Sequence, residues 1–167
     1  MNYGEDYVFE GEFRNDMANG LGLFYYKGDE SACLYTGELQ DYQKHGFGNE
    51  TCIDNEGYQG KAEVYAAHET KGETEGYSYY SGQYRLYYKH GQGTMKHQNG
   101  DIYKGGYLYD ERHGLGELQG KRQRFVGEFK NGVMHGDGRY FMEDGQSFEG
   151  VWENNALINR SELKHPE

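Results

Sequence analysis

Proline is almost absent from this sequence, and cysteine and long apolar runs are scarce. The 167 residues include 1 proline and 2 cysteines. Cys33 and Cys52 are too few for a disulfide framework, and they lack the Cys-x-x-Cys spacing of redox or metal motifs. No signal peptide and no apolar run of membrane-spanning length is recognisable. We therefore expect a soluble, cytoplasmic protein of a reducing compartment.

Positive charge is scarce as well. The chain has 17 Lys and Arg against 28 Asp and Glu, a formal net charge of −11. Nucleic acids and anionic membranes attract clustered cations, so this balance argues against nucleic-acid binding and makes membrane binding an unfavourable default. A basic cluster of Lys121, Arg122 and Arg124 is the candidate contact for a phospholipid head group or an acidic partner. A basic or amphipathic protein segment is the better expected partner.

Glycine and tyrosine are abundant. The sequence has 27 Gly and 18 Tyr, while apolar residues make up only 35%. That composition does not suit a compact globule with a large apolar core. The rings are nevertheless regularly spaced and able to bury area, which argues against disorder. The chain should be ordered and rich in β-structure.

A motif of the form aromatic-x-Gly-x-aromatic recurs along the chain. Its lead glycines are Gly11, Gly37, Gly60, Gly82, Gly105, Gly127 and Gly150. The steps between them are about 22–26 residues, a repeat period. The copy at Tyr58–Ala62 is the weakest.

A second signature, His-Gly-x-Gly, begins eight residues after most lead glycines. Its first residues are Asn19, His45, His90, His113 and His135. In the third copy His68 remains, but both glycines are lost, so the repeat over residues 58–79 is degenerate. Each regular unit reads as two short strands, in which the lead glycine leaves room for a ring from a neighbouring strand. Asn131–Gly132 predicts a tight hairpin turn, and the other units are expected to use looser turns.

The double motif resembles the MORN family (membrane occupation and recognition nexus repeats) from Tyr7 to Asn155. The resemblance implies an all-β fold: an elongated single-layer antiparallel sheet of about 6–7 stacked β-hairpins. Residues 1–155 would form the array. Residues 156–167 would be a C-terminal tail that forms either a cap or a short, partly frayed helix over the last sheet edge. The first unit is stretched around Gly28 to Leu34, and the third has lost its glycines between Lys61 and Tyr79.

Two aromatic rows should run across such a sheet. One contains Phe9, Tyr35, Tyr58, Tyr80, Tyr103, Phe125 and Phe148, and the other contains Phe13, Tyr84, Tyr107, Phe129 and Trp152. We expect these rows to leave one face aromatic and partly open, as binding surfaces are. The residues predicted to bind a partner are Tyr84, Tyr107, Phe129, Trp152, Tyr103 and Phe125.

Catalytic and metal chemistry are not expected. Histidines at one phase of adjacent repeats should lie about 10 Å apart, too far to share an ion, so their expected role is a turn-fixing hydrogen bond. Glutamates recur near the lead glycines, but an open sheet offers no enclosed pocket for paired acids, and solvated cross-strand charges are the better account. We expect no enzymatic activity, no cofactor and no metal.

The resemblance also implies a cellular setting. Short chains made only of MORN units occur in axonemal radial spokes, in basal cytoskeletal complexes and as adaptors for motor proteins. The leading hypothesis is therefore a scaffold of a ciliary axoneme or other cytoskeletal assembly, which binds a segment of a partner protein. A phospholipid-binding membrane tether is the alternative, and a regulatory lobe for an enzyme on another chain is a third. Exposed sheet edges also favour pairing of two copies.

Overall fold

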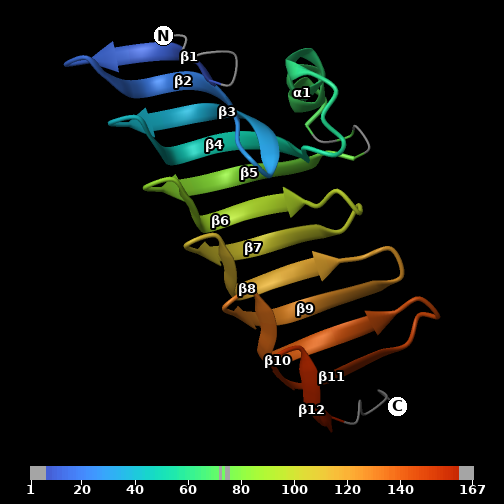
Figure 1. Ribbon diagram of the computed structural model, residues 1–167. Coiled ribbons are helices and arrows are strands. Elements are labelled where there is room, and N and C mark those ends of the chain that lie inside the picture. The colour runs from blue at the N-terminus through green and yellow to red at the C-terminus, as the bar shows by residue number, and fades with distance from the viewer. Residues whose placement is uncertain (1–6, 72, 74–75, 162–167) are drawn as a thin grey trace.

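The computed structural model describes residues 7–71, 73 and 76–161, and within them twelve strands form one antiparallel sheet in chain order (Figure 1). A nine-residue helix interrupts the array between the fourth and fifth strands. This confirms the all-β, single-layer expectation. The elements are β1 (Tyr7–Arg14), β2 (Met17–Lys27), β3 (Ser31–Gln40), β4 (Gln43–Asp54), α1 (Lys61–Glu69), β5 (Ser78–Arg85), β6 (Tyr88–Lys96), β7 (Ile102–Leu108), β8 (Glu111–Gln119), β9 (Gln123–Lys130), β10 (Val133–Met142), β11 (Ser147–Glu153) and β12 (Ala156–Ser161).

The six hairpins all close through a two-residue turn. Both turn residues have positive φ, as in Asn131 (φ 50°) and Gly132 (φ 81°). Two such residues match the type I′ turn, whose twist suits the flanking strands. The expectation of looser turns elsewhere was wrong. The other pairs are Asn15–Asp16, Asp41–Tyr42, Leu86–Tyr87, Tyr109–Asp110 and Asn154–Asn155.

Each turn after the first is hydrogen-bonded to the hairpin before it. The backbone N–H of Tyr42 donates to the carbonyl of Ala18 at 3.0 Å, and that of Tyr87 donates to the carbonyl of Lys44 at 3.0 Å. Asp110, Gly132 and Asn155 repeat the contact. The turns therefore stack into a continuous edge, which fixes the spacing between hairpins.

A ladder of glycines crosses the sheet from β1 to β11. Paired in register, its members are Gly11, Gly22, Gly37, Gly48, Gly82, Gly93, Gly105, Gly116, Gly127, Gly138 and Gly150. The ladder makes a strip without side chains across the sheet. An added Cβ on Gly105 would lie 2.6 Å from the Tyr103 hydroxyl oxygen, and one on Gly127 would lie 2.6 Å from Cζ of Phe125. The rings of Tyr103 and Phe125 thus lie over the glycine pair of their own hairpin, and the ring over each of these lead glycines comes from its own strand, not from a neighbouring strand as expected.

We call the side of the sheet that carries these rings the aromatic face. Three tyrosine hydroxyls each donate a hydrogen bond to the backbone carbonyl three residues further along the strand, with O···O distances of 2.8–3.0 Å. They belong to Tyr35, Tyr80 and Tyr103. Rings of the second row stand edge-on to rings of the first, as Phe129 does to Tyr103 with centroids 5.0 Å apart. Each such pair contributes about 0.5–1.5 kcal/mol beyond burial. The first-row rings lie flat over the glycines, and the second-row rings pack edge-on against them. Together they form the hydrophobic core on the aromatic face.

On the opposite side, the second face, a helix covers the N-terminal part of the sheet in the described structure. There α1 packs on β3 and β4, and Val64 and Ala67 meet Tyr25 and Leu34 in a separate apolar cluster. The segment carries good helix formers and none of the glycines of the other units, so the degenerate repeat forms a helix instead of a hairpin. Tyr58 belongs to this cluster and its hydroxyl lies 2.9 Å from that of Tyr25, so its assignment to the first aromatic row was wrong.

Two smaller expectations also fail. Residues 156–161 form the edge strand β12 instead of a short helix, paired with β11 from Glu153↔Ala156 to Glu149↔Ser161. The rest of that tail, residues 162–167, lies outside the described part. Cys33 and Cys52 face each other across β3 and β4, with Cα atoms 4.2 Å apart, and form a disulfide that the sequence analysis did not predict. The expected reducing compartment stays a prediction.

Candidate partner-binding surfaces

The six residues predicted to bind a partner are brought together, but they are buried. Tyr103 is 0% exposed and Tyr107, the most accessible of the six, is 7% exposed. Tyr84, Phe125, Phe129 and Trp152 lie between these values. The expectation that these positions form a partly open face was wrong because rings of adjacent hairpins pack against one another, as Phe129 does on Tyr103 and Trp152 on Phe125. Their partner-binding role stays a prediction without direct support, and their evident role is the core.

The aromatic face opens at its N-terminal end. A largely apolar hollow of about 440 Å³ lies over the first two hairpins. We call it the aromatic hollow, and its lining is Tyr7, Phe9, Phe13, Ala18, Phe24, Leu39, Tyr42 and Tyr87. Phe13 and Tyr87 are each 46% exposed. Exposed rings around a concave apolar surface are typical of a binding site.

The hollow exists because two repeat positions carry smaller side chains here than in the other hairpins. Leu39 stands where later hairpins carry the second-row rings Tyr84 and Tyr107. The second position is the one paired with the second-row residue across each hairpin. It is Ala18 in the first hairpin and Lys44 in the second. Missing side-chain volume at both positions leaves the neighbouring rings uncovered.

The turns beside the hollow carry bulky residues in a backbone conformation that disfavours them. Leu86 and Tyr87 have φ values of 50° and 74°, and Tyr42 has φ 65°. Left-handed backbone costs an L-residue roughly 1–2 kcal/mol, which is why Asn-Gly is preferred in such turns. Strain of this kind concentrates at functional sites. Here it presents Tyr42 and Tyr87 at the rim of the hollow.

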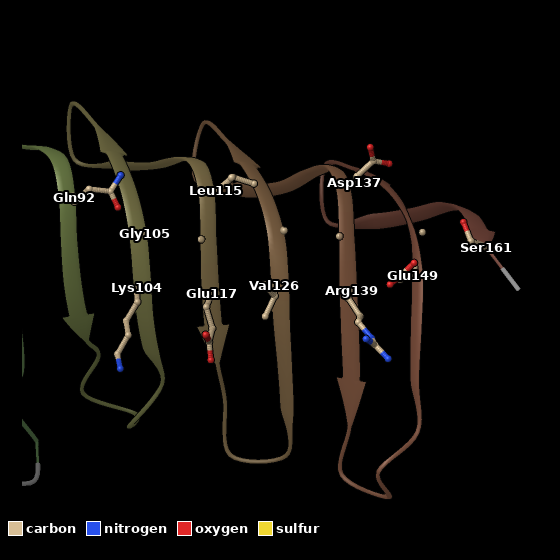
Figure 2. A pocket seen from close by; sticks show the side chains of 14 residues that line it. Gln92, Lys104, Gly105, Leu115, Glu117, Val126, Asp137, Arg139, Glu149 and Ser161 are labelled. Carbon is tan, nitrogen blue, oxygen red and sulfur yellow. The ribbon is translucent and has the colours of Figure 1, made fainter. Parts of the chain in front are cut away.

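A second depression lies on the second face, lined by residues from Gln92 in β6 to Ser161 in β12 (Figure 2). It is an open trough of about 730 Å³, floored by the ladder glycines of β7 to β11. One wall carries Lys104, Glu117, Val126, Arg139 and Glu149, and the other carries Gln92, Leu115 and Asp137. The walls mix both signs of charge with a few apolar groups. The trough could accept an extended chain, but it does not by itself select one.

The basic cluster is partly paired with acidic residues of the chain. Nε of Arg124 lies 2.6 Å from the Glu117 carboxylate, and Nε of Arg122 lies 3.7 Å from that of Glu143. The hydrogen bond from Arg124 holds the pKa of the Glu117 carboxyl below its usual range. Two of the three cations predicted to touch a phospholipid or acidic partner are therefore paired within the chain.

A buried ion pair replaces apolar packing in the second hairpin. Glu50 stands in the first aromatic row, where later hairpins carry Met95 and Leu118, and it pairs with Lys44. Tyr26 and Tyr84 donate to its two oxygens at 2.8 and 3.1 Å. Burial opposes ionisation of Glu50, but the charges of Lys44 and Lys89 and the hydrogen bonds hold its carboxyl pKa below the usual range. The same burial raises the pKa of the Tyr84 hydroxyl far above its ordinary value.

Among the described residues, Cys33, Glu50 and Cys52 are the one group of ligand-type side chains close enough together to hold a metal ion. The two sulfurs are joined in the disulfide, and Glu50 is satisfied by Lys44 and two tyrosines. This arrangement therefore offers no free thiolate. The described chain contains no helix long and apolar enough to cross a membrane.

The expected turn-fixing role of the histidines is wrong for three of them. Nδ1 of His45 and of His90 is buried without a hydrogen-bond partner in the described chain. His68 lies in α1, where Nε2 and Nδ1 are each 2.8 Å from a hydroxyl, of Thr36 and Thr51 respectively. No prediction from the sequence covered this contact.

The turn-side hydrogen bonds come instead from residues beside the lead glycines. Glu38 accepts from the backbone N–H of Phe47 at 3.0 Å, and Gln83 accepts from that of Gln92 at 2.7 Å. Glu128 lies against Gly136 in the same way. These side chains support the left-handed glycines of the second signature, and Glu38 is more than a solvated charge.

Together, the stacked hairpins and their open depressions indicate a repeat-based interaction module. The MORN repeat family profile matches residues 9–30, 35–56, 80–102, 103–122 and 125–147, more than half of the chain. The chain belongs to the MORN repeat family. Its degenerate unit and its last hairpin lie outside these matches.

Alsin is similar to part of the chain. Rat (Rattus norvegicus), mouse (Mus musculus) and human (Homo sapiens) Alsin are each 32% identical to it over 82 residues. The match spans 46% of this chain and 5% of Alsin. The family and this similarity support a repeat-based module that interacts with proteins or membranes.

Proposed function

We propose that this chain is a non-catalytic scaffold or adaptor that binds a segment of a partner protein in the aromatic hollow. The observation that supports the proposal is that exposed aromatic side chains surround an apolar depression. Two of these side chains lie on strained turns. Tyrosine is well suited to such a site because it offers large contact area with little loss of conformational entropy. Rings of this type are typical hot spots of protein interfaces.

We propose a ciliary axoneme or other cytoskeletal assembly as the setting, on the strength of the family resemblance. The cytoplasmic localisation and the absence of enzymatic activity and of cofactors belong to the same proposal. The membrane-tether alternative is less favoured because Arg122 and Arg124 are paired with Glu143 and Glu117.

The proposal is tested by exchanging the strained turn for the preferred one. Leu86→Asn/Tyr87→Gly should stabilise the fold by roughly 1–2 kcal/mol because Asn-Gly favours this turn, and it removes one ring from the rim of the hollow. We expect the variant to lose partners that the wild-type chain retains in affinity purification from its own cells. The matched control is Tyr109→Asn/Asp110→Gly, the same exchange at the next turn, where Tyr109 contacts Tyr88 and His90 and does not line the hollow.

Cytoskeletal or axonemal proteins that are lost with the first variant and kept with the second would support the proposal. Identical partners for all three chains would show that the hollow is not the docking surface. Liposome sedimentation of Lys121→Glu/Arg122→Glu/Arg124→Glu provides the membrane arm. Wild-type binding to phosphoinositide vesicles that this variant abolishes would favour the tether instead.

A further inference from the structure

The aromatic hollow occupies a repeat position at which three later hairpins carry a cation. Lys44, Lys89 and Arg112 follow one another along the sheet, each opposite a residue of the second row. Ala18, opposite Phe13, is the matching residue of the first hairpin. It is fully buried at the floor of the hollow.

Each of the three cations lies over the ring of the first-row residue of its own hairpin. Nζ of Lys89 is 5.4 Å from the centroid of Tyr80, and Cζ of Arg112 is 5.6 Å from that of Tyr103. Lys44 contacts Tyr35 at 5.4 Å in the same manner. Such distances are those of cation–π attraction, in which the charge meets the negative face of the ring. In each of these three hairpins, therefore, the cation at this position contacts the flat first-row ring.

The first hairpin supplies the rings without the cation. Phe9 is its first-row ring, and Phe13 and Tyr42 stand around it with ring centroids 5.1 and 6.5 Å away. Ala18 and Leu39 replace the bulkier residues of later hairpins, which leaves space beside these rings for a lysine or arginine side chain of another protein. The cationic group would then lie among these three rings, as it does three times further along the sheet.

The charges around the hollow agree with a cationic occupant. Asp16 and Asp41 lie in the two turns beside it, and the hydroxyl of Tyr42 donates to the Asp16 carbonyl at 2.7 Å. Arg14 follows Phe13 and so points to the second face by strand alternation. The charge of Lys44 is taken up by Glu50. The chain as a whole carries a formal net charge of −11.

We infer that the aromatic hollow binds a lysine or arginine side chain of the partner protein, which completes the cation–ring row that the first hairpin leaves unfilled. This inference rests on the proposed function and names the chemistry of its partner. The bound side chain would lie with its charged end among Phe9, Phe13 and Tyr42.

The test compares cationic and neutral probes on the full chain. The probes are N-acetyl-lysine methylamide and N-acetyl-arginine methylamide, with N-acetyl-norleucine methylamide as the neutral analogue of similar length. Titration is followed by NMR through the Ala18 methyl group and the ring signals of Phe13, Tyr42 and Tyr87. We expect both cationic probes to shift these signals and to bind about two- to fivefold more tightly than norleucine, the gain expected for an exposed cation–π site.

Two variants locate the effect. Ala18→Lys supplies the missing cation from the chain itself, so we expect it to abolish the response to both cationic probes. The ε-methylene signals of the new side chain should then show the upfield ring-current shift of those of Lys89. Phe13→Leu keeps an apolar wall but removes a half-exposed ring, and should reduce the preference for the cationic probes.

Equal affinity for norleucine and lysine would overturn the cationic occupant while leaving the hollow as an apolar docking surface. Absence of any response, with nuclear Overhauser contacts from the first six residues to the Ala18 methyl group, would show that the chain fills its own hollow and would also overturn the inference. Because the co-purification experiment uses separate variants, failure of the proposed function is distinguishable from failure of this inference.

Discussion

The two halves of the sheet bury their apolar side chains differently, although in the described chain neither has a second sheet packed against it. From β6 to β12 the repeat is regular: flat rings lie over paired glycines, apolar residues fill the rows between them, and the second face is bare apart from the trough. From β1 to β5 the rows contain Glu50, Lys44 and Ala18, and the second face carries an apolar cluster that α1 covers. The regular motif thus suffices for a stable layer. Departures from it bring a helix, a disulfide and a buried ion pair, all in the N-terminal half.

The same comparison explains where interaction surfaces lie. In the regular half the aromatic rows are complete, so the second-row rings and the first-row rings of the preceding hairpins bury one another. In the N-terminal half the rows are incomplete at Ala18 and Leu39, and the aromatic hollow results. A binding surface therefore arises here where a repeat is imperfect, and not where its aromatic motif is strongest.

Breaking the buried ion pair should give the largest effect. Lys44→Met leaves the Glu50 carboxylate buried without its cation, and we expect a loss of about 3–5 kcal/mol in the free energy of unfolding, measured by urea denaturation. Lys44→Met/Glu50→Met resembles the regular half, where Met95 and Met134 stand in these rows, and should recover more than half of that loss. Arg112→Met is the matched control because its row has no buried acid, and it should cost less than about 1.5 kcal/mol. A small loss for Lys44→Met would show that the N-terminal half does not depend on the pair.

Filling the glycine ladder in the regular half should have an intermediate effect. In Gly116→Ala the new Cβ would lie 2.6 Å from Cε2 of Tyr103, so the ring must leave its place and we expect a loss of about 1–3 kcal/mol. Gly28→Ala is the control, because its nearest neighbour would be the Ser31 carbonyl oxygen at 3.9 Å. The measurement is the midpoint of thermal unfolding, which we expect to be lower for Gly116→Ala than for Gly28→Ala. Equal midpoints would contradict the view that flat rings over glycines hold this half together.

Acidification should act most weakly, and on the N-terminal half. Burial lowers the pKa of His68, while Glu50 and Glu69 partly raise it, so the folded chain binds this proton less readily than the unfolded chain. Stability from this residue is therefore present above its unfolded pKa, about 6.5, and is lost as the pH falls from there through the lower folded value. We expect amide exchange in α1 and at Thr36 and Thr51 to accelerate over this range.

His68→Gln is the control for that prediction, since glutamine can bond both threonines but does not titrate. It should remove the acceleration in α1. His97 also has its pKa lowered by burial and by Arg112, so a response near the β6–β7 connection should persist in the variant. Unchanged acid sensitivity of α1 would assign the effect to other groups.

The sequence predicted the hairpin array, its antiparallel order and both aromatic rows apart from Tyr58, because period-2 alternation and a fixed repeat length determine which residues share a face. It did not predict that the rows would be buried. That depends on ring orientation: a tyrosine standing away from the sheet would be open, whereas Tyr35 lies flat over Gly37 and Gly48. The aromatic pattern alone does not distinguish the two.

Other features left signals that were missed. Once Gly37 and Gly48 are paired, counting four residues outward in the antiparallel register brings Cys33 opposite Cys52. The degenerate unit combines loss of both glycines with a run of helix-forming residues. The hollow too could have been found by aligning Ala18 with Lys44 across the repeats. The contacts of His68, by contrast, depend on how α1 docks, which no local pattern determines.

The hydrogen bond between successive turns gives the array a direction. In every such contact the donor belongs to the later hairpin and the acceptor to the earlier one, as with Tyr87 and Lys44. On a ribosome the acceptor therefore always emerges before its donor, and each completed hairpin is a template for the next. Assembly from the N-terminal end needs no long-range search, and synthesis and folding can proceed in step along the whole sheet.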